Sequence, residues 1–443
     1  MRIPERPPIV DKKFEYGHVL DELVKKGKLT QFFEKNDHSY PYWDKWKWMA
    51  KDWGMDPNKL WNAVKTYRQR KTIIQFSKLP GFQFFMNSPS ILLKHLHELD
   101  LNLGGSIQSE DLIPAEQKHM YLVGSLMEEA IASSQLEGAA TTRKMAKEML
   151  ENSRKPRNQS EQMIVNNYEA MRWIVENRNK KITVPNILHI HRILTKGTLH
   201  KTDEEGFFRK DDGVNVVDAA SGKVIYTPPL FKQLEQLMSD FCAFANNEDK
   251  GIFFIHPISK AIVVHFLIGY IHPFADGNGR TARTLFYWYL LKKNYWLIEY
   301  MSVSRIILNS KAQYAQAYLH TELDQNDLTY FLLYNVNAIQ KALNDLKAYI
   351  QNKNEERKKA LSLLKNASFN ERQLILINEM LQDTQISFTV LQVQNKMSIS
   401  NQTARNDLNE LEGRGFLESR KLGKQVHFFA VDGFEKRIVK EKR

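Results

Sequence analysis

A short polar loop between two apolar runs most constrains how this chain can fold. The apolar runs span 261–270 and 285–291, and between them the chain reads His-Pro-Phe-Ala-Asp-Gly-Asn-Gly-Arg-Thr-Ala-Arg from His272 to Arg283. Both runs are long enough for buried helices, although periodicity alone does not exclude strands. The breaker cluster 276–279 predicts a tight loop that opens the second helix.

The polar residues of this loop have the chemistry of an anion site. A helix N-terminus offers unpaired backbone N–H groups and a partial positive charge, and Gly277 and Gly279 allow the backbone to approach phosphate oxygens closely. Arg280 and Arg283 are three residues apart, so they share a helix face and can clamp a polyphosphate. The loop therefore predicts a site for a phosphate-bearing ligand.

Two further side chains of the loop indicate catalysis. His272, with an ordinary pKa of about 6.5, can take a proton near neutral pH. Asp276 is a hard carboxylate that suits Mg²⁺, which usually takes only one or two carboxylates from a protein. Each residue alone has a structural explanation, as a buried histidine, a turn or a solvated face. Together, a base, a metal carboxylate and an arginine-lined site are what phosphoryl or nucleotidyl transfer requires.

The segment from His272 to Arg283 resembles the signature of the Fic family, His-x-Phe-x-(Asp/Glu)-Gly-Asn-Gly-Arg-x-x-Arg, at every defined position. Most family members that are similar to this chain are adenylyltransferases, which move AMP from ATP to a Ser, Thr or Tyr hydroxyl of a protein and release pyrophosphate. The resemblance implies these roles: His272 deprotonates the target hydroxyl, Asp276 holds Mg²⁺ or Mn²⁺, Gly277, Asn278 and Gly279 form the anion hole, and Arg280 and Arg283 hold the β- and γ-phosphates.

A second segment lies far upstream, at the end of a run that predicts a helix over 117–136. Ser133, Glu137 and Gly138 resemble the family's inhibitory motif, (Ser/Thr)-x-x-x-Glu-(Gly/Asn), whose upstream position marks the self-inhibited class II arrangement. Glu137 would pair with Arg283 and remove the cation that should hold the γ-phosphate. The alternative is that Glu137 is an ordinary glutamate at a helix end.

The composition indicates a globular protein of two or three domains. The chain has 443 residues, of which 42% are hydrophobic and 26% charged. No run approaches the roughly 18 apolar residues of a membrane helix, and the polar, Pro-rich segment 1–13 lacks the apolar region of a signal peptide. Cys242 is the only cysteine, which favours a reducing cytoplasm. The net charge of +12 permits contact with nucleic acid without proving it.

Residues 1–105 are expected to form an N-terminal helical module. Asp56 and Pro57 are typical of a helix N-cap and first position. The segment 42–49 is aromatic and basic, and 65–71 contains four basic residues. Interleaved aromatic and basic side chains can bind nucleic acid, but a module with buried tryptophans and basic residues outside is the favoured interpretation. Gly104-Gly105 suggests the domain boundary.

Residues 106–350 are expected to form one helical domain that contains the loop. Two β-like runs, 214–217 and 223–226, surround Ser221-Gly222 and predict a hairpin. In the resembling family, a hairpin flap at this place lays the target segment over the active site by strand pairing, a mode with little sequence demand. The alternative is a structural insertion. By the same resemblance, Tyr314 is a candidate for stacking on the base, although an aromatic residue at helical spacing is more often core.

The C-terminal part predicts a separate unit. A charged helical linker is expected at 351–367, followed at 368–443 by three short helices and a strand pair that resemble a winged helix. The residues that would contact bases and phosphates are Ser400, Gln402, Thr403, Arg405 and Asn406 in the recognition helix, and Arg420, Lys421 and Lys424 in the wing. Winged helices also bind proteins or form dimers, so DNA binding and protein binding both stay open.

Together these observations predict a mostly α, cytoplasmic protein with a Fic-type helical core, a hairpin flap, an N-terminal helical module and a C-terminal winged helix. The expected activity is ATP- and Mg²⁺-dependent AMP transfer to a target protein, or to the protein itself, under inhibition by Glu137. The alternatives are a DNA-binding regulator with a nucleotide-sensing Fic domain, a transferase that uses another phosphate-bearing donor, and a kinase that acts on a translation factor. No membrane contact is expected, and a homodimer is compatible with the sequence.

Overall fold

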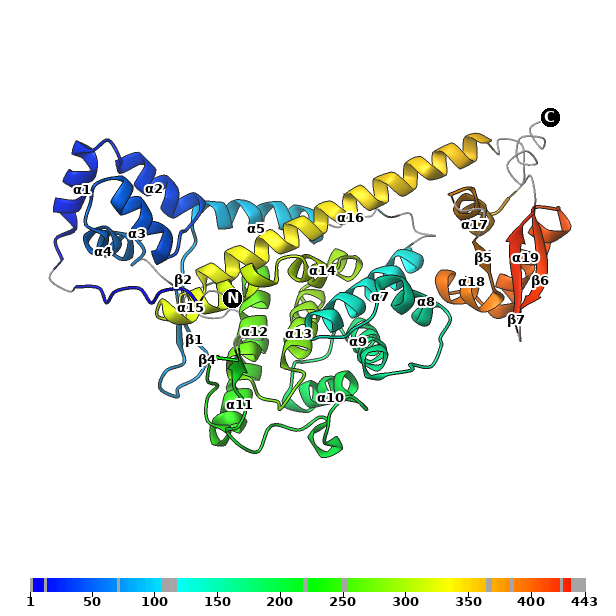
Figure 1. Cartoon of the computed structure of the whole chain (residues 1–443), viewed down its shortest axis with the longest axis horizontal. Coiled ribbons are helices and arrows are strands. Elements are labelled where there is room, and N and C mark those ends of the chain that lie inside the picture. The colour runs from blue at the N-terminus through cyan, green and yellow to red at the C-terminus, as the bar shows by residue number, and fades with distance from the viewer. Residues whose placement is uncertain are drawn as a thin grey trace.

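In its computed structural model the chain is described over residues 3–11, 14–69, 72–104, 113, 118–217, 222–247, 254–363, 369–382, 386–422 and 425–431. Over these residues the fold is mostly helical, with three small antiparallel sheets, which confirms the predicted fold class. Figure 1 shows an N-terminal module, a helical core and a C-terminal unit arranged along one long helix, α16 (Thr329–Leu363).

Four short helices form the N-terminal module around aromatic side chains. Trp43, Trp46 and Trp61 are buried in its core, and Asp56 and Pro57 cap and open the fourth helix as predicted. Because these tryptophans pack inward, the structure supports the core interpretation of this region rather than nucleic-acid binding. The helices are α1 (Tyr16–Lys25), α2 (Leu29–His38), α3 (Trp43–Asp52) and α4 (Pro57–Tyr67).

The expected boundary between the N-terminal module and the helical domain, at residue 105, does not match the packing of the segment before it. A hairpin of β1 (Thr72–Gln75) and β2 (Gln83–Met86) and helix α5 (Ser90–Leu103) follow the module, and the buried side chains of all three belong to the central core. The apolar residues of α5 recur every three or four positions, so that they form a single stripe facing that core. Gly105 itself lies outside the described residues.

The two apolar runs form the central helices α12 (Pro257–Ile271) and α13 (Asn278–Lys292), which pack against each other. α12 is apolar all round and is correspondingly buried along most of its length. This pair fixes both ends of the polar loop. The surrounding helices are α7 (Lys118–Leu136), α8 (Arg143–Glu151), α9 (Gln159–Glu176), α10 (Val184–Thr195), α11 (Leu234–Asn246), α14 (Val303–Leu308) and α15 (Lys311–Leu323).

The predicted hairpin is present, though its strands are shorter than expected. β3 (Val216–Val217) pairs with β4 (Val224–Tyr226), and Ser221 at the expected tip lies outside the described residues. The Tyr226 hydroxyl donates a hydrogen bond to the Tyr270 carbonyl at 2.8 Å. The hairpin is thus tied to the end of α12, immediately before the loop.

The C-terminal unit is a winged helix. Its three helices pack with a sheet in the order β5-β7-β6, whose first strand precedes the second helix. Ser400 caps the third helix by accepting a hydrogen bond from the Thr403 N–H at 3.0 Å. The expected linker is not a separate element, because α16 continues to Leu363. Lys424 lies outside the described residues. The elements are α17 (Glu371–Gln382), β5 (Ser387–Phe388), α18 (Val390–Met397), α19 (Asn401–Gly413), β6 (Leu417–Leu422) and β7 (Gln425–Ala430).

The winged helix contacts the rest of the chain through its first two helices, of which α17 packs against α16. α18 packs against α7 and α8, and the Asn395 amide donates hydrogen bonds to the Glu151 carbonyl at 2.7 Å and the Ser153 hydroxyl at 3.1 Å. Figure 1 shows α19 and the strands of the wing on the outer side of the unit. The helix expected to read DNA is therefore not one of the two that hold the unit to the rest of the chain.

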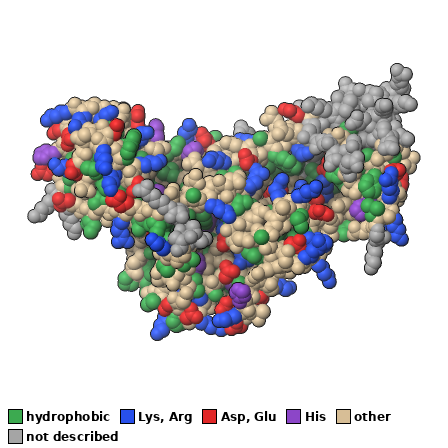
Figure 2. Space-filling model, viewed as in Figure 1, with side chains coloured by type: hydrophobic (Ala, Val, Ile, Leu, Met, Phe, Trp, Pro, Cys, Tyr) green, Lys and Arg blue, Asp and Glu red, His purple; other side chains and the backbone are tan. Residues whose placement is uncertain are grey.

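The described residues include no membrane helix, and the face shown in Figure 2 has no single dominant charged patch. Among the described residues no helix has the length and apolarity to cross a bilayer. On the face shown in Figure 2, basic and acidic side chains are interspersed, so the excess of positive charge is dispersed there. Cys242 is half-buried, and burial raises the pKa of its thiol to about 12. A reducing compartment stays a prediction of the sequence.

Candidate active site

His272 ends helix α12 in a left-handed conformation, with φ of 50°. Its Nδ1 lies 3.2 Å from the Gly269 carbonyl, an acceptor that requires a proton on Nδ1 and so leaves Nε2 as the unprotonated nitrogen. Burial lowers the pKa of His272 below its usual value. The imidazole is thus suited to accept a proton through Nε2 near neutral pH.

The loop after His272 is closed by one side chain. The Asn278 amide donates to the Phe274 carbonyl at 2.8 Å and accepts from the Phe274 N–H at 2.9 Å. Asn278 is buried, so its side chain holds the loop rather than reaching toward a ligand. Only its backbone N–H, in the first turn of α13, is available for the anion role implied by the resemblance.

The two glycines of the loop are required for different reasons. Gly277 has φ of 83°, and a Cβ there would lie 2.9 Å from Cγ2 of Thr195. A Cβ on Gly279 would lie only 2.1 Å from Oε1 of Glu137. The Glu137 carboxylate thus lies directly against Gly279, at the positive N-terminal end of α13, where an anion is favoured.

Arg283 is held by the upstream helix. Its Nε donates to the Ser133 hydroxyl, and its Nη2 donates to the Ser133 carbonyl and to Glu137, each at 2.9 Å. Burial would lower the pKa of Arg283, but Glu137 opposes this and the net shift is upward, so the guanidinium stays charged. The structure therefore brings the two predicted motifs together, although 146 positions separate Glu137 from Arg283.

The same helix is anchored one turn before Ser133 by a buried carboxylate. Glu129 accepts hydrogen bonds from the hydroxyls of Tyr287 and Ser302 at 2.8 and 3.0 Å, and from the Ser304 N–H at 3.0 Å. Burial raises the pKa of Glu129, and these donors oppose the shift. Glu129 and Ser133 are one turn apart on the face of α7 that meets α13, and Glu137 follows directly after the end of this helix.

Arg280 is buried and has one donor without a partner. Its Nη1 donates to the Leu194 carbonyl at 3.0 Å and its Nη2 lies 3.5 Å from the Asp276 carboxylate, whereas its buried Nε has no hydrogen-bond partner among the described residues. Burial lowers the pKa of Arg280, partly offset by Asp276. An unpaired buried donor beside the helix N-terminus suits a phosphate oxygen.

A metal would depend on a single carboxylate. Asp276 is 62% exposed at its side chain, and the described residues contain no group of three or more His, Cys, Asp or Glu arranged to hold a metal. One accessible carboxylate fits Mg²⁺ or Mn²⁺ that is also bound by nucleotide phosphates, and it does not fit a metal held by protein alone. Asp276 is therefore chemically suited to the predicted role.

Tyr314 lies among aromatic side chains of the core. Its hydroxyl is 2.8 Å from Nε2 of His265, and its ring packs against Tyr318, Phe331 and Tyr334. Burial raises the pKa of Tyr314 to about 12. These contacts favour the core interpretation over base stacking.

Sequence reasoning missed two residues that hold the loop. The buried Arg209 donates from its backbone N–H to the Pro273 carbonyl at 2.9 Å and from Nε to the His272 carbonyl at 3.0 Å. His191, on α10, bonds to the Asp276 carbonyl at 2.9 Å. Burial lowers the pKa of His191 to about 4, so it is neutral at physiological pH. Both side chains form hydrogen bonds to backbone carbonyls, which every residue has. The identity of the residues that supply these carbonyls therefore gives no signal in the sequence.

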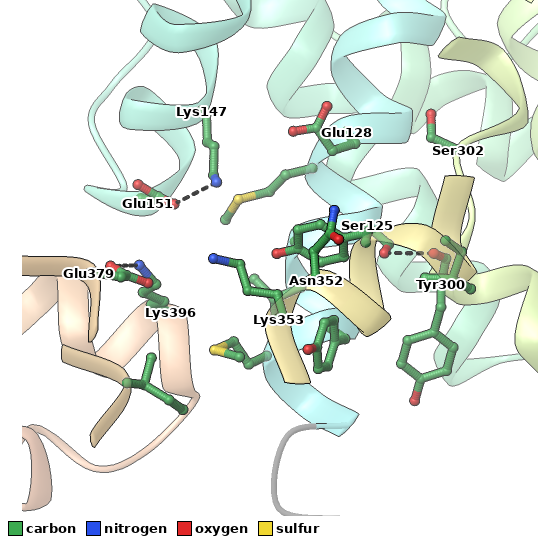
Figure 3. A pocket seen from close by; sticks show the side chains of 18 of the residues that line it. Ser125, Glu128, Lys147, Glu151, Tyr300, Ser302, Asn352, Lys353, Glu379 and Lys396 are labelled. Carbon is green, nitrogen blue, oxygen red and sulfur yellow. Dashed lines mark hydrogen bonds and ion pairs between the residues drawn. The ribbon is translucent and has the colours of Figure 1, made fainter. Parts of the chain in front are cut away.

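A cleft of about 1010 Å³ lies outside the motif, between helices α7, α8 and α16 of the core and the winged helix. Figure 3 shows its charged lining, in which Lys147 pairs with Glu151 at 3.7 Å and Lys396 with Glu379 at 2.5 Å. These charges are already paired and come from both units. The cleft is therefore a junction between domains rather than the nucleotide site.

Comparison with known proteins identifies two domains in the chain. The profile of the Fic/DOC family matches residues 181–290, which include the flap and the loop, and the profile of the DeoR-like helix-turn-helix domain matches 372–423. The protein adenylyltransferase Fic of Nematostella vectensis is 36% identical over 120 residues, covering 26% of this chain and 25% of the relative. That of Aedes aegypti is 36% identical over 131 residues, 28% of this chain and 23% of the relative.

These alignments span about a quarter of the length of the curated relatives. A crystal structure of a Fic family protein from Desulfovibrio desulfuricans G20 superposes with a TM-score of 0.47 at 18% identity, covering 77% of this chain and 94% of the other. The profile matches fall on the helical core and on the winged helix described above. The chain therefore contains a Fic domain at 181–290 and a C-terminal winged helix of the DeoR-like helix-turn-helix type at 372–423.

Proposed function

We propose that the chain is a protein adenylyltransferase that moves AMP from ATP to a Ser, Thr or Tyr hydroxyl of a target protein and is inhibited by its own Glu137. The observation that carries the proposal is the position of the Glu137 carboxylate, which bonds to Arg283 and lies against Gly279. A carboxylate fits there because the site is built for anions. Phosphates of a nucleotide are the anions that the surrounding donors suit.

In the proposed reaction, His272 accepts the proton of the target hydroxyl through Nε2. The hydroxyl oxygen forms a bond to the α-phosphorus, and the bond between that phosphorus and the bridging oxygen breaks to release pyrophosphate. Arg280, Arg283 and the first N–H groups of α13 would stabilise the negative charge of the phosphates. Mg²⁺ or Mn²⁺, held by Asp276 and the nucleotide, would supply further neutralisation of the leaving group.

In the proposed inhibition, the Glu137 carboxylate competes with the nucleotide phosphates for Arg283 and for the space beside Gly279. While Glu137 pairs with Arg283, this cation is unavailable to the γ-phosphate, and the carboxylate repels any phosphate that approaches Gly279. Because the Glu137 side chain is 28% exposed and that of Arg283 only 4%, the glutamate can leave the pair by moving toward solvent. The trigger would therefore act on Glu137 and its backbone rather than on the arginine.

Intact-mass spectrometry with Mg²⁺ and ATP tests the proposal. An added mass of AMP should grow on a protein substrate, or on the protein itself, faster with Glu137→Gly than with the wild type. It should vanish with Glu137→Gly/His272→Ala. An added phosphate would indicate the kinase instead, and transfer that survives His272→Ala would exclude His272 as the base.

A second candidate function, DNA binding, is favoured by the position of α19. Arg405 is exposed on this helix, and the contacts with the rest of the chain are made by α17 and α18. In a gel-shift assay with DNA fragments selected for binding from a random pool, Arg405→Ala should weaken binding while AMP transfer is unchanged. Asn409→Ala, in the C-terminal half of the same helix, is the matched control. Binding unaffected by Arg405→Ala would favour a protein partner or a dimer contact.

A further inference from the structure

His191 is the one buried histidine that touches the catalytic loop, defined as residues 272–279, from outside it in the described structure. Its side chain has no exposed surface, and its ring is stacked on Phe274 with centroids 3.7 Å apart and planes inclined by 5°. Such parallel contact covers one face of the imidazole completely. The ring is therefore fixed in orientation before any hydrogen bond is considered.

Both ring nitrogens of His191 have backbone partners. The Gly206 N–H donates to Nδ1 at 3.0 Å, and Nε2 lies 2.9 Å from the Asp276 carbonyl. A carbonyl needs a donor and an N–H needs an acceptor, so the neutral tautomer with its proton on Nε2 satisfies both partners together. The imidazole thus connects the segment before the flap to the middle of the catalytic loop.

The space around this connection is tight on both sides. A Cβ on Gly277 would lie 3.2 Å from Nε2 of His191, and a Cβ on Gly206 would lie 2.9 Å from Cβ of Arg192. Helix α10 therefore lies close to neighbouring backbone at two points, through His191 and through Arg192. A side chain of different shape or hydrogen bonding at this position cannot make both contacts.

We infer that His191 is a positioning residue, which sets the backbone of the catalytic loop at Asp276 and thereby the place of the metal-binding carboxylate. This inference rests on the proposed adenylyl transfer. The carbonyl and the carboxylate of Asp276 belong to one residue, so fixing the first restricts where the second can lie. Removing a residue that positions a metal ligand without binding the metal itself commonly lowers metal affinity or activity by about 10- to 100-fold.

Three variants in the Glu137→Gly background isolate this role. His191→Phe keeps an aromatic ring against Phe274 but has no nitrogen for either partner. His191→Gln restores a donor that can reach the Asp276 carbonyl. His189→Phe is the matched control, because His189 lies on the same helix and packs on Trp173, with ring centroids 5.3 Å apart, away from the catalytic loop.

The decisive readout is the Mg²⁺ concentration that gives half-maximal AMP transfer. It should rise about tenfold or more with His191→Phe, recover in part with His191→Gln and stay unchanged with His189→Phe. Binding of Mn²⁺, measured by electron paramagnetic resonance with a non-hydrolysable ATP analogue, should weaken in the same order. Unchanged metal dependence in His191→Phe, with a melting temperature equal to that of the control, would overturn the inference.

The experiments distinguish a failure of the proposed adenylyl transfer from a failure of the inference about His191. If the Glu137→Gly parent transfers no AMP, the reaction is wrong, but Mn²⁺ binding to the nucleotide complex still tests His191. The ¹⁵N NMR signals of labelled histidine give an independent check, since the signals lost in His191→Phe should have Nε2 protonated and Nδ1 unprotonated. The opposite tautomer would exclude the connection between Gly206 and Asp276.

Discussion

The Glu137 carboxylate and the Arg283 guanidinium are joined by a hydrogen bond of 2.9 Å across 146 positions of sequence. The same carboxylate lies where a Cβ on Gly279 would come within 2.1 Å of it. One side chain therefore takes both the cation and the open approach to the N-terminus of α13. These two contacts can be tested independently.

Glu137→Gly should increase AMP transfer by about 10- to 100-fold, because a hydrogen bond between charged groups contributes about 1.5–3 kcal/mol. Initial rates of incorporation from ATP labelled at the α-phosphate measure the effect. Glu148→Gly removes an exposed charge from the adjacent helix α8 and should leave the rate unchanged. Equal rates for Glu137→Gly and wild type would exclude self-inhibition by this residue.

Gly279→Ala should reduce transfer at least tenfold in the Glu137→Gly background, since the added methyl group fills the approach to the N–H groups of α13. Rates at saturating and limiting ATP separate lost affinity from lost turnover. Gly124→Ala is the matched control, because a Cβ there has no neighbour within 4 Å. If the double variant keeps full activity, phosphates do not use the space that Glu137 takes.

The acidic limb of the pH–rate profile should lie below pH 6.5. Burial lowers the pKa of His272 from its usual value of 6.5, and a histidine acts as a base only in its unprotonated form. The lower pKa therefore extends activity to more acidic pH. The profile of kcat/KM for Glu137→Gly checks this, and an acidic limb centred above pH 7 would contradict the assignment.

Stability should decrease as the pH falls from 6.5 toward 4. Burial lowers the pKa of His191 and His320 to about 4 and that of His265 to about 3, so the unfolded chain binds protons in this range and the native chain does not. Each site contributes up to about 1.4 kcal/mol per pH unit. Urea unfolding at several pH values gives the free energy of unfolding as a function of pH. This free energy should fall less steeply between pH 6.5 and 4 for His320→Phe, which cannot titrate, than for the exposed control His97→Phe. Equal slopes would contradict the prediction.

Lys65→Met should lower the free energy of unfolding by about 3–5 kcal/mol, because it leaves a buried carboxylate without its cation. Lys65 and Asp324 are 2.6 Å apart, and their side chains are only 4% and 3% exposed. Lys59→Met, on the exposed side of the same helix, should change stability by about 0.5 kcal/mol or less. A loss below about 1 kcal/mol for Lys65→Met would show that Asp324 finds other compensation.

Features with local chemical causes were predictable from the sequence. The N-caps at Asp56 and Ser400 were predicted from residue type and were observed, and the winged helix followed from the order of its short elements. The loop from His272 to Arg283 was found because all its polar residues are adjacent in sequence. The roles of these residues, the bound metal and the homodimer stay predictions.

Features that depend on distant packing were not predictable in the same way. The β1–β2 hairpin was missed, although Pro80-Gly81 is a typical turn signal between its strands. α5 was assigned to the N-terminal module, because the sequence does not show which of two cores a stripe of leucines will meet. His191 and Arg209 were missed because their partners are backbone groups.

The contact between Asn395 and the end of α8 has a mechanical consequence. Upstream, α7 is held in place by the hydrogen bonds of Glu129. Downstream, the end of α8 is hydrogen-bonded to Asn395 of the winged helix. Between these fixed points the chain turns at Gly138, with φ of 93° and open space where a Cβ would be. Glu137 directly precedes this turn, so the place of its carboxylate depends on how α7 and α8 are held relative to each other.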